Sequence, residues 1–259
     1  MEECPLPMPE PLQQPEESLQ PQLQPEVPEP GRDGDDSYPN ASWGPLGGLG
    51  IAILSLFFGL LVSIPFLALG SGDASDLDLE TTVAIQVATA IGFIFVPIVA
   101  AAILSGSLGR GLRQLGFVSF SLKTALIWSG IGILAYLAFA LFYVTVIGPA
   151  EQDDIASEFG PVWIQVLLIV IAAPLAEEIC FRGLLFRGFR TRLPFWLSAI
   201  LAASVFGLLH YETGVSAIPL LIFLGVVFAL VYEKTGSLWP AIILHAANNL
   251  FALVALSAT

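Results

Sequence analysis

The stretch VWIQVLLIVIAAPLAEEICFRG, residues 162–183, places two adjacent glutamates and an arginine at the end of an apolar run. A run of this length is typical of a helix that crosses a lipid bilayer, whose core requires about 20 residues. Each charge near the middle of the bilayer costs roughly 2.5–3.5 kcal/mol on insertion scales. Glu177, Glu178 and Arg182 therefore indicate a polar site inside the membrane, where ionisable residues are rare and usually functional.

The composition of the whole chain also indicates an integral membrane protein. Hydrophobic residues make up 56% of the 259 residues and charged residues only 12%, against about 25% charged in soluble domains. The net charge of −13 says little about partners, because the ten acids and one arginine of residues 1–43 already account for most of it. No basic patch indicates nucleic-acid binding. The two cysteines form no zinc-binding or disulfide pattern.

The chain divides into an acidic tail and a membrane domain. Residues 1–43 contain ten prolines and five glutamines and have no apolar period, so we predict a disordered tail that cannot bury enough apolar surface to fold. Residues 44–259 form the predicted transmembrane domain. Its apolar segments are 45–69, 82–104, 124–148, 161–186, 194–211, 215–233 and 238–257. The predicted fold is therefore an all-α polytopic bundle of about seven transmembrane helices, the fifth and sixth being short.

The positions of the cations predict the orientation of this bundle. Lys and Arg lie between the second and third segments, between the fourth and fifth, and after the sixth. The loops SGDASDLDLE and EQDDIASEFG contain no Lys or Arg. If the segments alternate, the cations fall on one side, which should be cytoplasmic. We therefore expect a multi-pass protein of the cell membrane with a cytoplasmic N-terminus.

Helical spacing predicts how the charges of the fourth segment are paired. Glu178 and Arg182 are four residues apart and share a helix face. Glu177 has no cation three or four residues later on its own helix, so its partner must come from another helix. The two histidines of the chain, His210 and His245, both lie in such segments.

A second spacing adds an amide to this set. His245 and Asn249 are again four residues apart. The simplest packing brings Glu177, His210, His245 and Asn249 around one water-accessible cavity. There the glutamate can take a proton from water, and His and Asn can donate hydrogen bonds to an oxyanion. Two His and a Glu also form a plausible zinc set.

Purely structural explanations exist for each of these residues taken alone. The Glu178–Arg182 pair can serve only to fix helix packing. A histidine near a helix end, such as His210, often contacts headgroups or a backbone carbonyl. Asparagine in a membrane helix commonly joins neighbouring helices. The functional interpretation depends on the joint presence of all these residues.

Three motifs resemble those of one protein family. EEICFR (177–182), FGLLH (206–210) and HAANN (245–249) are similar to the ordered motifs EExxxR, FxxxH and HxxxN. These belong to the CPBP family, the intramembrane proteases that include CAAX prenyl proteases and bacteriocin-processing or immunity-type proteins, also called Abi. LRQLGF (112–117) adds to the likeness, which covers about residues 110–255.

The resemblance implies roles for the site residues. Glu177 would activate water, His210 would hold and polarise it, and His245 and Asn249 would stabilise the oxyanion. Glu178 and Arg182 would orient the site. The family has been described both as metal-dependent and as metal-free, and we favour a mechanism without a cofactor. If zinc is bound, the expected ligands are His210, His245 and Glu177.

The leading functional hypothesis is an endopeptidase that hydrolyses a peptide bond in or near the bilayer. Its expected substrate is a membrane-associated protein or peptide, such as a leader peptide or a prenylated C-terminus. The alternatives are a non-catalytic scaffold or immunity-type protein, and a proton-coupled transporter. The segments show no matched halves of the kind typical of transporters. The sequence does not indicate an oligomeric state.

Overall fold

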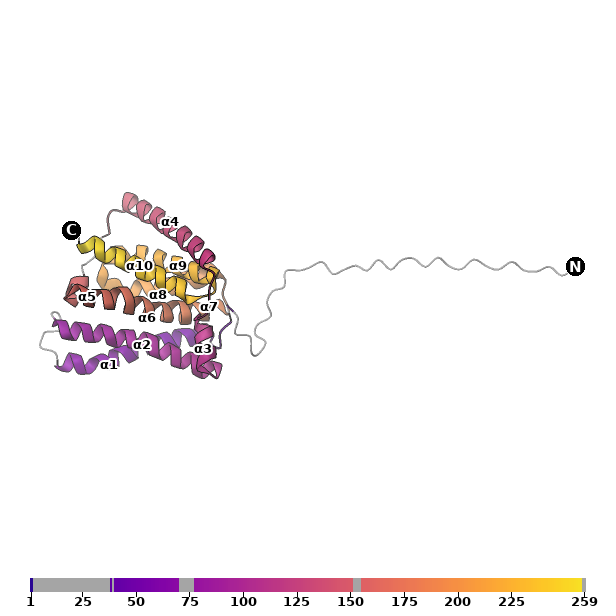
Figure 1. The fold of residues 1–259 in the computed structure, drawn as a ribbon, viewed down its shortest axis with the longest axis horizontal. Coiled ribbons are helices and arrows are strands. Elements are labelled where there is room, and N and C mark those ends of the chain that lie inside the picture. Colours follow the sequence, from indigo (N-terminus) through magenta and orange to yellow (C-terminus); the bar gives the residue numbers. More distant parts are fainter. Residues whose placement is uncertain (2–37, 39, 70–76, 151–154, 258–259) are drawn as a thin grey trace.

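The computed structural model describes residues 1, 38, 40–69, 77–150 and 155–257, and the regular elements within these residues are helices (Figure 1). The elements are α1 (Pro45–Leu69), α2 (Leu79–Ser105), α3 (Leu108–Leu115), α4 (Leu122–Val146), η1 (Ile155–Phe159), α5 (Val162–Gln165), η2 (Val166–Ala172), α6 (Ala173–Glu177), η3 (Glu178–Phe186), α7 (Arg187–Arg190), α8 (Phe195–Leu209), η4 (Tyr211–Thr213), η5 (Val215–Ala217), α9 (Ile218–Thr235) and α10 (Leu238–Ser257). The run from α5 to α7 is one continuous helix over residues 162–190, which we call the central helix.

Six helices among the described residues are long and apolar enough to cross a membrane. They correspond to six of the seven predicted segments, and the predicted all-α polytopic bundle is confirmed. The remaining segment, 194–211, forms α8, which has only 15 residues. At 1.5 Å per residue this helix is about 22 Å long, less than the roughly 30 Å of the hydrocarbon core.

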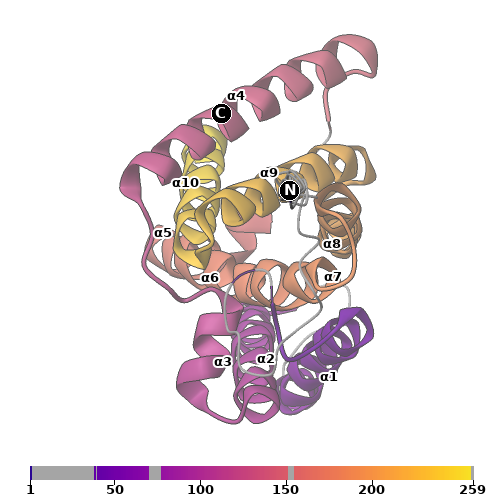
Figure 2. The same ribbon diagram turned by 90° about the vertical axis from the view of Figure 1, so that its right-hand side faces the viewer.

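The central helix lies in the middle of the bundle. Figures 1 and 2 place α1 and α2 on one side of it and α8, α9 and α10 on the other, with α4 outermost against α9. The largest buried cluster includes residues of α2, of the central helix and of α8 to α10. Side chains near the middle of the central helix therefore face residues from both groups of helices.

Cations that the sequence places between or after the apolar segments lie on α3, α7 and α9 and meet at one end of the bundle. Arg187 donates to the carbonyl of Arg113 at 3.2 Å, Arg190 pairs with Glu233 at 2.9 Å, and the Lys234 ammonium lies over the ring of Trp128. We call this the cationic end. Its placement at the cytoplasmic face remains a prediction.

The end of the predicted tail packs against the cationic end. Most of residues 1–43 lie outside the described residues, but Tyr38 and residues 40–43 are described. Burial raises the pKa of Tyr38, so its phenol stays protonated and donates to the carboxylate of Glu233. The indole of Trp43 is 3% exposed and donates to the carbonyl of Leu184 at 2.9 Å. The packed part of the chain therefore begins before residue 44.

We expect Trp43→Phe to lower the stability of the protein by about 1–3 kcal/mol. The substitution removes a buried hydrogen bond and part of a packed ring, and each loss is destabilising. Thermal unfolding in detergent measures the effect. Trp163→Phe is the matched control, because Trp163 is 68% exposed. Equal stability of the two variants would show that the contact between Trp43 and the central helix contributes little.

Candidate active site

The central helix is irregular beside the predicted site, and a proline explains part of this. In η2 the N–H of Ala173 bonds to the carbonyl of Leu168, five residues back. In the same register the carbonyl of Ile169 would need an N–H at residue 174, which is proline and has none. The side-chain amide of Asn249 instead donates to Ile169 O at 3.0 Å. The wide helical turn thereby ties α10 to the central helix about two turns before the glutamates.

Glu178 and Arg182 form the ion pair that their spacing predicts. Arg182 Nη1 lies 2.8 Å from Glu178 Oε1, and both residues are at most 1% exposed. The same Oε1 accepts from His245 Nδ1 at 2.9 Å, whereas Glu178 Oε2 is buried without a hydrogen-bond partner among the described residues. A buried charge pair of this kind is costly to break, because the remaining charge loses its compensation.

Arg182 also connects the central helix to α8 and α9. Its Nη2 donates to the carbonyl of Gly225 at 3.2 Å, and its guanidinium lies 4.7 Å from the ring centre of Phe206 and 5.1 Å from that of Phe228. A Cβ at Gly225 would come within 3.1 Å of Nη2, so a glycine there allows the close approach. His245 stacks on Phe228 at 4.6 Å. The ion pair and the two rings thus fix the position of the imidazole.

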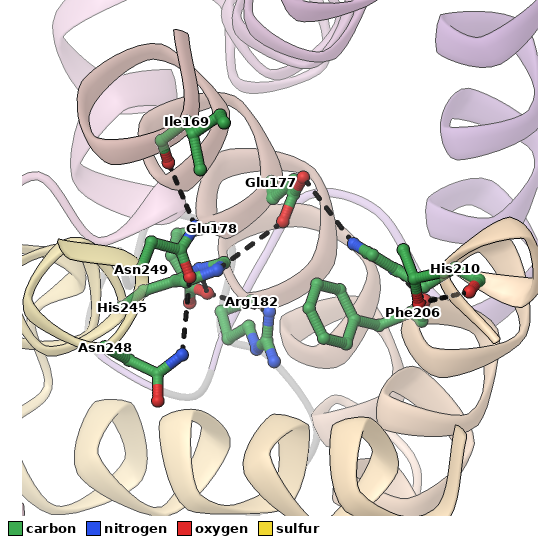
Figure 3. A network of polar contacts seen from close by, with 10 residues as sticks. Ile169, Glu177, Glu178, Arg182, Phe206, His210, His245, Asn248 and Asn249 are labelled. Carbon is green, nitrogen blue, oxygen red and sulfur yellow. Dashed lines mark hydrogen bonds and ion pairs between the residues drawn. The ribbon is translucent and has the colours of Figure 1, made fainter. Parts of the chain in front are cut away.

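Glu177 lies between the two histidines, as Figure 3 shows. Its Oε1 is 3.9 Å from His210 Nε2 and its Oε2 is 3.7 Å from His245 Nε2. The side chains of His210, Glu177 and His245 are 27%, 16% and 4% exposed. The site is therefore open on the His210 side and closed behind His245. Separations of this size are too long for direct hydrogen bonds, but they let one water molecule contact the carboxylate and an imidazole together.

The partners of the other ring nitrogens assign the tautomers. His210 Nδ1 lies 2.7 Å from the carbonyl of Phe206, which can only accept, so Nδ1 carries a proton. The same argument applies to His245 Nδ1, which faces the Glu178 carboxylate. A neutral imidazole in this state presents the Nε2 lone pair to the cavity, whereas an imidazolium presents an Nε2–H donor.

The site residues line a partly open cavity of about 430 Å³. Glu177, His210, His245 and Asn249 all contribute to its wall, so the structure brings together the four residues for which catalytic roles are predicted. Glu178 and Arg182 do not line the cavity and lie behind His245. The cavity extends toward the end of the bundle opposite the cations, because its lining includes residues of η1 and η4.

Other polar residues of the wall do not belong to the predicted site. Gln86 and Thr89 come from α2, and Glu212 and Thr213 come from η4. In the sequence, only the presence of polar side chains within an apolar segment could have drawn attention to Gln86 and Thr89. Spacing alone does not show which helix faces the glutamates.

The described residues contain no group of three His, Cys, Asp or Glu side chains arranged to hold a metal ion. The set of His210, His245 and Glu177 expected for zinc does not meet this requirement in the arrangement observed. Glu178 accepts a hydrogen bond from His245 Nδ1, which leaves Nε2 of this imidazole on the side of Glu177.

Fold and site together define a polytopic helical membrane protein with a carboxylate–imidazole site in a partly open cavity between its helices. Residues 159–251 match the family described as type II CAAX prenyl endopeptidase, Rce1-like. This segment is less than half of the chain and carries all three motifs, and the match confirms the resemblance inferred from them.

Two curated relatives are similar to this chain at a distance. A Bacillus subtilis protein named "Putative membrane peptidase YdiL" is 25% identical over 115 residues, which are 44% of this chain and 46% of that protein. The "UPF0177 protein YbdI" of Lactococcus lactis is 28% identical over 119 residues, 46% of this chain and 64% of that protein. The chain thus spans about half to two thirds of the length of these relatives. No solved structure matches the chain.

Proposed function

We propose that the protein is an intramembrane endopeptidase in which Glu177 activates water. The observation that carries this proposal is the placement of the Glu177 carboxylate between two Nε2 atoms, at 3.9 and 3.7 Å, in the wall of a cavity inside a membrane bundle. The family match and the name of the Bacillus subtilis relative support peptidase activity. The substrate is a membrane-associated protein or peptide.

The first step is the attack of water on the scissile carbonyl. The water molecule donates one hydrogen bond to the Glu177 carboxylate and the other to the Nε2 lone pair of His210. As the oxygen of the water molecule bonds to the carbonyl carbon, Glu177 takes its proton as general base. His210 keeps its Nδ1 proton, which the Phe206 carbonyl holds in place, and so orients the water.

The second step is the stabilisation and collapse of the tetrahedral intermediate. His245 as an imidazolium donates from Nε2 to the oxyanion, and Asn249 donates the amide hydrogen that its bond to Ile169 leaves free. Glu177 then returns its proton to the leaving amine as the carbon–nitrogen bond breaks.

Incubation of the protein in liposomes with a quenched-fluorescence peptide library in ¹⁸O-enriched water tests this proposal. The expected result is cleavage with one ¹⁸O in the new carboxyl group, because the attacking oxygen comes from water. A scaffold or a transporter would leave the peptides intact. The absence of cleavage across the library would overturn the proposal.

A separate prediction concerns metal. Because every step above uses only side chains of the chain, we expect cleavage to persist after dialysis against EDTA and 1,10-phenanthroline. Elemental analysis of the purified protein should give less than stoichiometric zinc. Loss of cleavage with the chelators and its recovery on addition of zinc would show that a metal-dependent mechanism operates instead.

A further inference from the structure

Helix α2 contributes one face to the cavity wall, although it lies outside the matched segment 159–251. Gln86, Thr89, Ala90 and Phe93 line the cavity, and their spacing of three and four residues places them on one side of the helix. Figures 1 and 2 both show α2 beside α6, which carries Glu177. The site is therefore completed by a helix that the motifs do not include.

The two polar residues on this face, Gln86 and Thr89, have no side-chain hydrogen-bond partner among the residues that the structure describes. Both side chains are half-buried in a membrane span. Two polar side chains of other spans are paired locally. Ser63 donates to Gly59 O at 2.8 Å and Gln165 donates to Gly160 O at 2.7 Å. Gln86 and Thr89 thus keep their hydrogen-bonding groups available to whatever fills the cavity.

We propose that Gln86 and Thr89 bind the backbone of a substrate that enters the cavity as an extended segment. This inference depends on the proposed function. A primary amide offers a carbonyl and two N–H groups, which match the N–H and C=O of one peptide unit, and the hydroxyl can pair with the next. The two positions are about 4.5 Å apart along the helix axis, comparable with the rise of one to two residues in an extended chain.

An intact transmembrane helix does not suit this wall. Its backbone N–H and C=O groups are satisfied within the helix, so it would leave Gln86 and Thr89 without partners. The substrate class is therefore a loop, a chain terminus or an unwound helix end, held by its main chain beside the Glu177 carboxylate.

The test compares Gln86→Leu and Thr89→Val with the wild-type protein in liposomes, on a peptide that the wild-type protein cleaves. Each variant is expected to raise KM about 2–12-fold, the range for loss of one ordinary hydrogen bond, with little change in kcat. Thr82→Val is the matched control, since Thr82 is on the same helix and does not line the cavity. The thermal unfolding temperature of the variants should not fall, because each replaces a polar group in a membrane span by an apolar one.

A substrate with backbone esters distinguishes the loss of a hydrogen bond between Gln86 and the substrate from a structural effect of the Gln86 substitution. Replacing the peptide N–H on either side of the scissile bond by an ester oxygen removes one donor from the substrate. If Gln86 accepts from one of these N–H groups, that ester weakens cleavage by the wild-type protein but costs Gln86→Leu nothing further. Binding of the same peptides to Glu177→Gln protein, followed by fluorescence anisotropy, gives the readout without turnover. A peptide stapled as a helix should resist cleavage.

The outcomes distinguish this inference from the proposed function. If the wild-type protein cleaves no peptide, the peptidase assignment fails. If it cleaves, but both variants keep the wild-type KM and every ester penalty is the same in wild-type and Gln86→Leu protein, the backbone-binding role of α2 is wrong. Efficient cleavage of the stapled helix would also overturn it.

Discussion

Glu177→Gln is expected to lower kcat for peptide cleavage by about 10²–10⁴-fold, the usual contribution of a positioned general base. Glutamine keeps the size and the hydrogen-bonding reach of the side chain but cannot take a proton from water. The carboxylate is partly exposed to the cavity and bonds directly to neither histidine. Its replacement should therefore leave insertion and thermal unfolding nearly unchanged. Single-turnover cleavage of a fluorogenic peptide in liposomes measures the effect.

Glu80→Gln is the matched control, because Glu80 is an exposed carboxylate in the first turn of α2 and does not line the cavity. Its cleavage rate should equal that of the wild-type protein. If Glu177→Gln retains the wild-type rate while the protein is folded, the base has been assigned to the wrong residue. If both variants lose activity, the loss comes from the removal of a negative charge in general or from the protein preparation. The assignment of Glu177 as the base then has no support.

The membrane bundle could be predicted from the sequence because its signals are local. Each apolar segment needs only length and composition to be recognised, and the predicted segment 45–69 coincides with α1. The 15 residues of α8 between Pro194 and His210 are too few to cross the bilayer core. The short amphipathic helix α3 (Leu108–Leu115) was not predicted, since it carries no long apolar run.

The candidate site could be predicted in part. Spacing along one helix gave the pair of Glu178 and Arg182, and the lack of a local cation for Glu177 pointed to a partner on another helix. The shared contact of Glu178 Oε1 with both Arg182 and His245 depends on how α10 packs, and helical periodicity does not encode that. The partner of Asn249 is a carbonyl freed by Pro174, which requires the register of η2 to be known.

Arg182→Met is expected to destabilise the protein by about 3–5 kcal/mol, the usual cost of removing one partner of a buried ion pair. Methionine fills much of the volume but leaves the Glu178 carboxylate buried, with Oε2 already lacking a partner among the described residues. It also removes the bond to Gly225 O and the contacts with Phe206 and Phe228. Equilibrium unfolding in mixed micelles measures the change in stability.

Arg190→Met provides the comparison within the same helix. The Arg190–Glu233 pair lies at the cationic end, where the two side chains are 17% and 18% exposed. Partly solvated pairs contribute less, about 0.2–1 kcal/mol at the surface. A loss at Arg182 no larger than that at Arg190 would show that the buried pair does not stabilise the bundle.

The double variant Glu178→Gln/Arg182→Met distinguishes the effect of the Glu178 charge from the effect of how His245 is held in place. Replacing both charges removes the unpaired carboxylate, and substitution of a whole buried pair is often nearly neutral, so we expect most of the stability lost in Arg182→Met to return. The substituted glutamine side chain would still accept from His245 Nδ1 but would not stabilise an imidazolium. The oxyanion donor would therefore be weakened, and kcat of the double variant should be below the wild-type value with KM little changed.

A double variant with recovered stability and wild-type kcat would show that the Glu178 charge has no part in catalysis. A double variant that recovered no stability and had a low kcat would show that the contacts of the guanidinium with Gly225 and the two rings, and not its charge, hold His245 in place.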